Sequence, residues 1–425
     1  MINNGIFKFH SFGSWLNFLN NNLVNYSIDN SLERILYVAK RLGILKSNVF
    51  SIIVGGTNGK STVCFILESL FLELGYQVGL YTSPHLIQYC ERLRINGLEL
   101  DNSIHIESFS DIRYFQKDIL LTRFEFITLS SLLIFKSYNL DIMILEVGLG
   151  GKLDATNILD YDISVITNIG LDHMNVLGRD RKSISIQKSG IFRKNKICVI
   201  GDKNLPTVSK NIAKARQVKL KIIDEDWMYT KSQSSWNFFS KRVEWLNLSL
   251  PKISLESAAI ALMVVLESGI SIQKKIFRKS VSKIKLKGRF EIIHNDPTII
   301  LDVAHNYHAV YHLFNNFLSK IKVKGKLYAI VGMMKDKDIR STMIPLISIV
   351  NYWYCVTLCT NRSATSKQIL QYLPVSVSQR VKNMNIALKS VLDRIKYSDT
   401  ILVFGSFHAV FEARHFLIKN KIFKV

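Results

Sequence analysis

Short apolar runs alternate with segments of helical spacing along most of this chain. Runs at 51–56 (SIIVGG), 77–83 (QVGLYTS) and 141–148 (DIMILEVG) have the length and composition of buried strands, and 163–170 and 196–202 continue the series. Between the first two runs, residues 61–75 have helical spacing and end at Gly75, a typical helix C-cap. This alternation predicts a parallel sheet covered by helices.

A second series of the same kind fills the last third of the chain. It begins near KGRFE, and its apolar runs lie at 298–306, 326–333, 351–358 and 399–410. Between 224 and 256 the pattern loosens, and three tryptophans among polar residues suggest a small antiparallel sheet. The length suits roughly two or three domains. We therefore expect an α/β fold of two doubly wound domains, residues 1–287 and 288–425, joined near Lys287 and Gly288.

The first predicted strand runs into a glycine-rich turn, GGTNGKST at 55–62, and then into the first predicted helix. Gly56 and Gly59 permit a tight backbone whose N–H groups face a phosphate, and the helix N-terminus adds its dipole. Lys60 can reach the outer phosphates of a nucleotide. The usual spacing, G-x-x-x-x-G-K-[ST], requires glycine at position 54, where Val54 stands. Strand, loop and helix in this order still predict nucleotide binding.

Polar side chains stand at or soon after the ends of three predicted strands. Glu146 ends one run, Ser83 ends another, and His173 follows a third. Carboxylate and hydroxyl oxygens suit magnesium, and imidazole can join them. Each residue alone has an ordinary explanation, as a surface charge or a turn residue. Because carboxyl ends of parallel strands share one edge of a sheet, their convergence beside the loop predicts a metal site.

Lys188 lies in a helical stretch soon after His173. As an ammonium it would repel a magnesium ion, and a solvated surface lysine is the ordinary interpretation.

The chain is strongly basic, with 56 Lys and Arg against 33 Asp and Glu and a formal net charge of +23. Such a charge suits an anionic partner: nucleic acid, phosphates or polycarboxylates. The basic residues are scattered and form no stripe with interleaved aromatics. Compositional drift with an anionic substrate is therefore favoured over nucleic-acid binding, and we expect no nucleic-acid partner.

The 5 cysteines are odd in number and widely spread, without a C-x-x-C pair. They are typical of reduced thiols in the cytoplasm. The N-terminus lacks a long apolar stretch, and no segment reaches the roughly 18 apolar residues of a membrane span. We expect a cytoplasmic protein without a membrane partner.

Taken together, GGTNGKST, YTSPHLIQYCERLRING, EVGLGGKLDATN, LDHMNVLG, QKSGIF and DVAHN resemble the Mur ligase superfamily. The likeness is to its bifunctional dihydrofolate synthase/folylpolyglutamate synthase branch and runs from about Trp15 to about Ala413. In that family the phosphate loop is shortened to G-T-N-G-K, which accounts for Val54. The resemblance implies an N-terminal P-loop ATPase-like Mur ligase central domain and a smaller C-terminal Rossmann-like Mur ligase domain.

The resemblance also implies the chemistry. ATP activates a folate-type carboxylate as an acyl phosphate, and the amine of L-glutamate attacks it. Expected substrates are ATP, dihydropteroate, tetrahydrofolate polyglutamates and L-glutamate, with two Mg²⁺ ions and K⁺ as a further candidate. A monomer is expected.

Site residues follow from the same resemblance, position by position. The expected ATP contacts are Gly56, Thr57, Asn58, Gly59, Lys60, Ser61, Thr62, Ser257, Arg289 and Asp302. The expected metal site comprises Ser83, Glu146, His173 and a carbamylated Lys188, and the catalytic residues are Lys60, His173 and Lys188. The segments matching the pterin site are Asp29, Asn30, Ser31, Leu32, Thr122, Arg123, Phe124, Glu125, Leu153, Asp154 and Ala155. His305 and Ser406 are candidates at strand ends of the second domain.

Four positions depart from the family pattern. Ser257 replaces the usual Asn, Tyr307 the usual Pro and Ser31 a common Gly, and Arg123 stands where an aromatic residue is frequent. Three alternatives remain open: a ligase with only one of the two activities, a P-loop NTPase of another kind, and a nucleic-acid-binding protein. The second leaves the second α/β domain unexplained, and the third rests on charge alone.

Overall fold

The computed structural model describes residues 11–23, 31–320 and 325–422, so Asp29 and Asn30 lie outside the described residues. The chain divides into two compact units, Met1–Ile169 with Arg179–Ile284 and Gly170–Gly178 with Lys285–Val425. Each is described by itself below. A short excursion from the first unit thus groups with the second. The division into domains after residue 287 stays a prediction.

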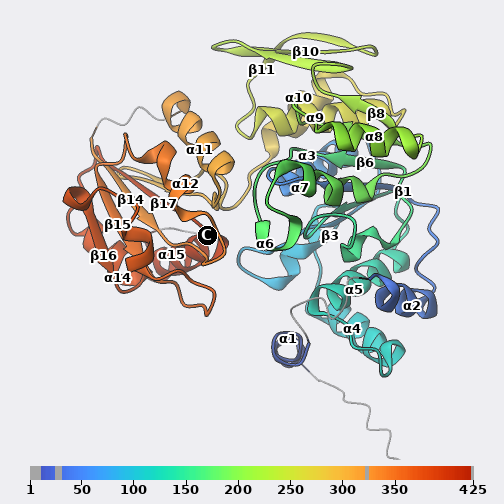
Figure 1. The fold of residues 1–425 in the computed structure, drawn as a ribbon, viewed down its shortest axis with the longest axis horizontal. Coiled ribbons are helices and arrows are strands. Elements are labelled where there is room, and N and C mark those ends of the chain that lie inside the picture. Colours follow the sequence, from blue (N-terminus) through green and yellow to red (C-terminus); the bar gives the residue numbers. More distant parts are fainter. Residues whose placement is uncertain (1–10, 24–30, 321–324, 423–425) are drawn as a thin grey trace, which may run out of the picture. The chain divides into compact units, whose positions relative to one another are not determined.

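The first unit contains an eight-stranded sheet (Figure 1). Six of its strands, β1, β2, β5, β6, β7 and β8, run parallel, while β3 and β4 form an antiparallel edge. In spatial order the strands are β4 (Leu98–Glu99), β3 (Leu93–Ile95), β2 (Val78–Tyr81), β5 (Ile142–Glu146), β1 (Phe50–Gly55), β6 (Ile163–Ile166), β7 (Ile197–Ile200) and β8 (Lys219–Ile222). The central position of β1 places its loop between the ends of β5 and β6.

Helices cover both faces of this sheet. On one face α3 packs on the strands and beneath α9 and α10 (Figure 1). On the other face α5 packs on the sheet, where the hydroxyl of Thr128 lies 3.3 Å from that of Tyr81 in β2. Burial on both faces explains the nearly continuous apolar runs of the central strands. The helices of this unit are α1 (Phe12–Asn21), α2 (Glu33–Leu42), α3 (Lys60–Glu73), α4 (Asn102–Gln116), α5 (Arg123–Ser137), α7 (Arg181–Lys188), α8 (Thr207–Ala215), α9 (Leu255–Glu267) and α10 (Lys274–Lys283).

The loosened stretch between 224 and 256 folds as the expected antiparallel sheet. It comprises β9 (Trp227–Lys231), β10 (Ser235–Ser240) and β11 (Glu244–Ser249), in the order β11-β10-β9. Trp227 and Trp236 are buried, and the ring of Trp236 lies 6.0 Å from that of Phe277 in α10. This small sheet extends the core above α3, as its aromatic content indicates.

A buried ion pair joins the antiparallel edge of the large sheet to α3. Arg94 Nε of β3 lies 3.0 Å from Glu68 Oε1, and the Glu68 side chain is only 4% exposed. Burial raises the pKa of Glu68, although the Arg94 charge opposes the shift. The carboxylate therefore depends on Arg94 for its charged form.

Replacing Arg94 by Met should destabilise the protein by about 3 kcal/mol at pH 7, because a buried carboxylate loses its cation. With its pKa raised further above the unfolded value, Glu68 binds a proton more readily in the folded state, so the loss should shrink as the pH falls toward 5. Urea unfolding at the two pH values measures this. Adding Glu68→Gln should recover stability at pH 7; equal losses in the single and double variants would contradict the argument.

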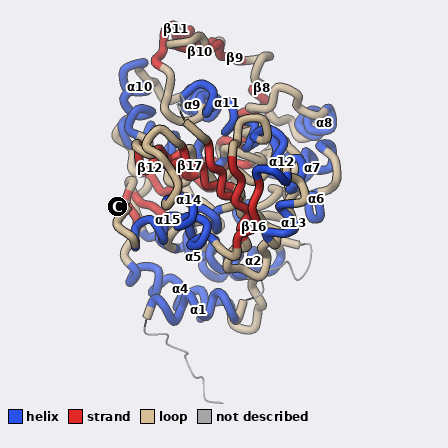
Figure 2. The backbone as a smooth tube through the Cα atoms, turned by 90° about the vertical axis from the view of Figure 1, so that its left-hand side faces the viewer, coloured by secondary structure: helices blue, strands red, loops and turns tan. Residues whose placement is uncertain are grey.

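The second unit contains a six-stranded sheet, parallel except for β12. Figure 2 shows α11 and α12 on one side of its strands and α14 and α15 on the other. In spatial order the strands are β12 (Glu291–Asn295), β13 (Thr298–Leu301), β17 (Thr400–Phe404), β14 (Leu327–Val331), β15 (Tyr352–Val356) and β16 (Ser378–Val381). The helices are α6 (Met174–Leu177), α11 (Tyr307–Lys320), α12 (Ile339–Met343), α13 (Ser366–Leu370), α14 (Met384–Leu392) and α15 (Phe407–Lys419).

The two sheets confirm the expected α/β class with two doubly wound units. Short one-turn 3-10 helices complete the connections: η1 (Tyr89–Arg92), η2 (Ala155–Ile158), η3 (Ser189–Ile191), η4 (Ile344–Leu346) and η5 (Val375–Val377). All five cysteines are free thiols, and only Cys359 is exposed. Within the described part of the chain, no helix has the length and apolar character that crossing a bilayer requires.

Candidate active site

The glycine-rich loop connects the end of β1 to the first residue of α3, as the sequence predicts. Asn168, just after β6, shapes it: the backbone N–H of Thr57 donates to the Asn168 carbonyl at 2.9 Å, and the N–H of Asn58 donates to Asn168 Oδ1 at 3.0 Å. Lys60 Nζ folds over the loop and donates to the carbonyls of Gly56 (3.2 Å) and Thr57 (3.3 Å). The ammonium and the helix N-terminus thus lie at one point, where a phosphate binds well.

Gly56 lets the loop approach β6 closely. Its φ is +140°, and a Cβ at this position would lie 1.8 Å from Oγ1 of Thr167, which itself donates to the Asn58 carbonyl at 2.6 Å. A side chain at residue 56 would therefore displace the residues that hold the loop.

Gly56→Ala should weaken binding of a non-hydrolysable ATP analogue and lower stability by on the order of 1–3 kcal/mol, because the added methyl overpacks the loop against Thr167. Calorimetric titration and denaturant unfolding measure the two effects. Gly75→Ala is the matched control, since Gly75 also has positive φ (+91°) but nothing within 4 Å of its Cβ position. If both variants behave alike, backbone strain alone accounts for the loss.

A buried carboxylate links the loop helix to the end of the neighbouring strand. Glu146 is the last residue of β5 and is 2% exposed. Its Oε1 accepts the hydroxyl of Ser61 at 2.9 Å, and its Oε2 accepts the backbone N–H of Ser83 at 3.0 Å. Three residues from different parts of the chain therefore meet beside the loop. For Glu146 and Ser83, the expected convergence of strand ends is seen in the structure.

Lys188 is the last residue of α7 and is 3% exposed. The helix end packs on the glycine-rich turn after β5, where the N–H of Lys152 donates to the Gln187 carbonyl at 2.8 Å. The residue is therefore not a solvated surface lysine, which was the ordinary interpretation of its sequence context.

The magnesium expected from the sequence can be tested against these residues. Among residues 11–23, 31–320 and 325–422, no group of three or more His, Cys, Asp or Glu side chains could hold a metal ion. Glu146 with the Ser61 and Ser83 hydroxyls is nevertheless the kind of set that binds Mg²⁺ jointly with substrate phosphates, because this ion commonly uses one or two carboxylates and takes its other oxygens from phosphate and water. The residues fit a nucleotide-bound magnesium.

The segment Thr122–Glu125 was expected to hold the pterin, and two of its residues have a structural task. They form a capping box at α5: the Thr122 hydroxyl accepts the N–H of Glu125 at 3.2 Å, and Glu125 Oε2 accepts the N–H of Thr122 at 2.7 Å. Arg34 of α2 also binds Glu125 Oε1 at 3.1 Å. The pattern T-x-x-E is readable in the sequence as a helix start, and this signal was missed.

The two central residues of that segment, Arg123 and Phe124, take no part in the capping box. Phe124 packs over Gly148 and lies 6.3 Å, ring to ring, from Tyr81. Arg123 is half-buried, and burial together with the nearby charge of Arg92 lowers the pKa of its guanidinium. The substrate role of these two residues stays a prediction, while their neighbours Thr122 and Glu125 cap the helix.

The remaining pterin-segment residues are mixed in exposure. Asp154 is buried and accepts the N–H of Leu149 at 2.7 Å and the Thr156 hydroxyl at 2.6 Å, so it organises its own turn. Burial raises the pKa of this carboxyl, and these hydrogen bonds oppose the rise. Ala155 is buried and Leu153 is 44% exposed; Ser31 and Leu32 precede α2 and are partly exposed. Their substrate role stays a prediction.

Ser257, in the first turn of α9, is buried at the phosphate loop. A Cβ on Gly59 would lie 3.3 Å from its hydroxyl oxygen. Thr62, in the first turn of α3, is also buried, at 4% exposure. The adenine contact proposed for Ser257 is untested.

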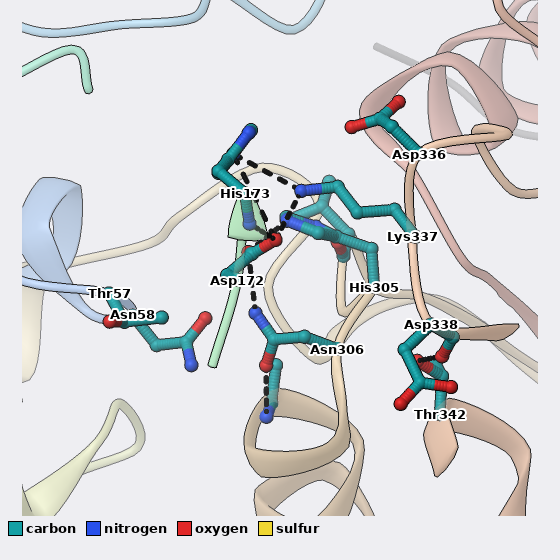
Figure 3. Close-up of polar contacts among 12 residues, drawn as sticks. Thr57, Asn58, Asp172, His173, His305, Asn306, Asp336, Lys337, Asp338 and Thr342 are labelled. Atoms are coloured by element: carbon teal, nitrogen blue, oxygen red, sulfur yellow. Dashed lines mark hydrogen bonds and ion pairs between the residues drawn. The ribbon is translucent and has the colours of Figure 1, made fainter. Parts of the chain in front are cut away.

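In the second unit, three residues from the C-terminal part of the chain converge on one carboxylate, Asp172 (Figure 3). Lys337 Nζ lies 2.6 Å from Asp172 Oδ1, Asn306 Nδ2 donates to Oδ2 at 3.0 Å, and His305 Nε2 lies 3.5 Å from Oδ2. Burial raises the pKa of Asp172, but the His305 hydrogen bond and the Lys337 charge outweigh it and hold this pKa well below its usual range. Asp172, Asn306 and Lys337 were not among the predicted residues.

His173 follows in this segment and is held in neutral form. Its Nε2 lies 3.1 Å from Lys337 Nζ, and burial and the Lys337 charge lower its pKa to about 4. An ammonium can only donate to this nitrogen. His173 belongs to the second unit, whereas Glu146 and Ser83 belong to the first. Its role as a metal ligand stays a prediction.

The two second-unit residues expected to contact ATP lie on adjacent segments. Asp302 is the residue after β13, and its carboxylate accepts the N–H groups of Phe290 and Ala304, each at 2.7 Å. Burial raises its pKa, which those bonds and Arg289 counteract. The Arg289 guanidinium lies 6.0 Å from the ring centre of Phe407. Asp302 thus organises the turn that carries Arg289. Ser406, by contrast, caps α15 by accepting the N–H of Ala409.

A phosphate loop opening a helix at the carboxyl edge of a parallel sheet defines a nucleotide-binding enzyme of the P-loop type. The family described as "Mur ligase middle domain" matches residues 54–260, and "Mur ligase, glutamate ligase domain" matches 288–407. A relative from Buchnera aphidicola subsp. Baizongia pistaciae, named dihydrofolate synthase/folylpolyglutamate synthase, is 54% identical over 427 residues, which cover 100% of both chains. The chain therefore belongs to the dihydrofolate synthase/folylpolyglutamate synthase group of the Mur ligase family.

Solved structures agree. Escherichia coli FolC in complex with DHPP and ADP is 41% identical and has a TM-score of 0.92, with 97% of this chain and 98% of that chain covered. A bifunctional folylpolyglutamate synthase/dihydrofolate synthase with Mn, AMPPNP and L-glutamate bound is 38% identical and has a TM-score of 0.90, with coverage of 97% and 99%. Adenine nucleotide, a divalent metal and small-molecule substrates thus bind to these similar proteins.

Proposed function

We propose that this protein is an ATP-dependent ligase of folate biosynthesis. It joins L-glutamate to dihydropteroate, giving dihydrofolate, and to tetrahydrofolate or its polyglutamates. The observation that carries the proposal is the meeting of Ser61, Ser83 and Glu146 beside the loop that holds Lys60. A nucleotide loop with a buried carboxylate at its side is suited to phosphoryl transfer, and the full-length similarity to bifunctional synthases supplies the acceptor.

The reaction proceeds in two steps. The carboxylate of the pterin substrate attacks the γ-phosphorus of ATP, and the bond from this phosphorus to the β,γ-bridging oxygen breaks. ADP is the leaving group, and the product of this step is an acyl phosphate. The glutamate amine then attacks the carbonyl carbon and loses a proton, and phosphate leaves through a tetrahedral intermediate. Such a reaction depends mainly on positioning and charge stabilisation.

The chain contributes fixed groups to the first step. Loop N–H groups and the N-terminus of α3 favour the phosphates, and the Lys60 ammonium exchanges its carbonyl partners for phosphate oxygens. Glu146, Ser61 and Ser83 would hold magnesium, which neutralises phosphate charge when bound. His173 and Lys188 are proposed as further ligands, and a second Mg²⁺ and a K⁺ are part of the proposal.

The remaining partners are proposed on the same basis. Ser257, Arg289 and Asp302 would contact ATP, and the segments around Ser31, Arg123 and Asp154 would hold the pterin. We expect a cytoplasmic monomer that acts on small molecules and binds no nucleic acid. The free cysteines, four of them buried, support a reducing compartment.

ADP release tests the proposal when it is measured with dihydropteroate or tetrahydrofolate, each with and without glutamate. Sustained release should require both a pterin substrate and glutamate. Release without either would indicate a P-loop NTPase of another kind. Turnover with only one pterin would indicate a ligase with a single activity.

A further inference from the structure

The segment Gly170–Gly178, which we call the excursion, is connected through the chain to the first unit at both ends, but its side-chain contacts are with the second unit. It leaves the first unit after Ile169 and returns at Arg179. Its Asp172 is 7% exposed as a side chain and is bound by Lys337 and Asn306 of the second unit. The middle of the segment therefore follows the second unit.

The residues that flank the segment, which we call its roots, are hydrogen-bonded to each other within the first unit. Arg181, the first residue of α7, donates from Nε to the Ile169 carbonyl at 2.9 Å. Its Nη2 lies 2.9 Å from both carboxylate oxygens of Asp202, just after β7. Asp202 Oδ2 also accepts the N–H of Ile169 at 2.7 Å, and its side chain is 7% exposed. Arg181, Asp202 and Ile169 form what we call the root clamp.

The root clamp adjoins the phosphate loop through the chain itself. Ile169 directly follows Asn168, which binds the N–H groups of Thr57 and Asn58. The chain that leaves β6 therefore first shapes the nucleotide loop, through Asn168, and then continues directly into the excursion. Ile169 is one residue away from Asn168, which holds the loop, and three residues away from Asp172, so a displacement of Ile169 would be passed to both.

We propose that Arg181 and Asp202 are positioning residues for ligation, which couple the phosphate loop to the segment carrying Asp172 and His173. They touch no reacting atom. By holding Ile169 against the start of α7, they fix the strand end next to Asn168 and the two points at which residues 170–178 leave and rejoin the first unit. The proposal rests on the ligase activity proposed above.

Removing the clamp should affect turnover more than nucleotide binding. Arg181→Ala leaves Lys60, Ser61 and Glu146 intact, so affinity for AMPPNP should change little. Its kcat should fall by about 10- to 100-fold, since small misplacements of catalytic groups cost that much. Arg181→Lys should recover only part of kcat, because one ammonium cannot serve the planar, multi-donor geometry of a guanidinium.

Asp180→Ala is the matched control. Asp180 caps the same helix by accepting the N–H of Ser183 at 2.7 Å, but it makes no contact of the clamp. This variant removes the cap at the start of α7 but keeps the hydrogen bonds of the root clamp, so its kcat should stay near wild type. Equal losses of kcat in Arg181→Ala and Asp180→Ala would show that helix stability, and not the clamp, is responsible.

Hydrogen–deuterium exchange gives a readout independent of catalysis. Exchange across 170–178 should rise in full-length Arg181→Ala and in Asp202→Asn, and remain at the wild-type level in Asp180→Ala. Unchanged exchange in the first two variants, or a parallel loss of AMPPNP affinity and kcat, would overturn the proposal. If the wild-type protein lacked ligase turnover, the proposed function would fail, while the exchange result would still report on the clamp.

Discussion

Lys60→Ala should abolish ligation while the protein remains folded. Lys60 is the first residue of α3, and its ammonium rests on two loop carbonyls at 3.2 and 3.3 Å, outside the hydrophobic core. Losing a preorganised charge at a developing phosphoryl transition state costs on the order of 10²–10³ in rate. Steady-state ADP release measures the loss, and far-UV circular dichroism checks the fold.

A lysine at the opposite end of the same sheet supplies the control for Lys60. Lys196 precedes β7 and pairs with Asp162 at 2.8 Å, and its side chain is 48% exposed. Lys196→Ala removes an equal charge from the first unit, so its rate should stay near wild type. Near-normal turnover of Lys60→Ala would remove the loop lysine from the mechanism.

Lys188→Ala should lose most of its activity and regain part of it when small carboxylates such as acetate are added. Lys188 is the last residue of α7 and its side chain is buried. The hypothesis is that CO₂ has added to its neutral amine to form a carbamate, which offers the oxygen ligands that magnesium prefers. An added carboxylate would then occupy the vacated space and replace those oxygens.

Lys188→Arg separates this hypothesis from a simple charge effect. It keeps the cation but forms no carbamate, so it should remain inactive even with acetate. A carbamate carbon should also be visible by ¹³C NMR after growth in ¹³C-bicarbonate and absent in Lys188→Arg. Wild-type activity of Lys188→Arg, in a variant with unchanged thermal unfolding, would show that the residue acts as a cation.

The strands and the phosphate loop could be predicted because local patterns determine them. The run ending in Glu146 is apolar because β5 is buried on both faces, and its last residue then meets Ser61 and Ser83 as sheet geometry requires. The sequence pattern placed Lys188 correctly in a helix but could not report its burial, because burial depends on tertiary packing and leaves no local signal.

Long-range polar contacts were beyond the sequence pattern. Asn306 and Lys337, which bind Asp172, lie 134 and 165 positions away from it, and such long-range contacts leave no periodicity from which a partner could be inferred. His173 was therefore predicted at a strand end of the first domain, whereas its segment groups with the second unit. The Thr122–Glu125 capping box was legible locally, but the substrate interpretation of the segment obscured it.

The excursion Gly170–Gly178 bears on how this family can be divided or recombined. A gene cut between the codons for Ile284 and Lys285 would leave Asp172 on one polypeptide and Lys337 on the other, each with its buried charge unmatched. We expect the two fragments to express poorly apart and to require co-expression. By the same reasoning, a chimera that exchanges the C-terminal part with a relative should keep its stability only if residues 170–178 come from the same parent.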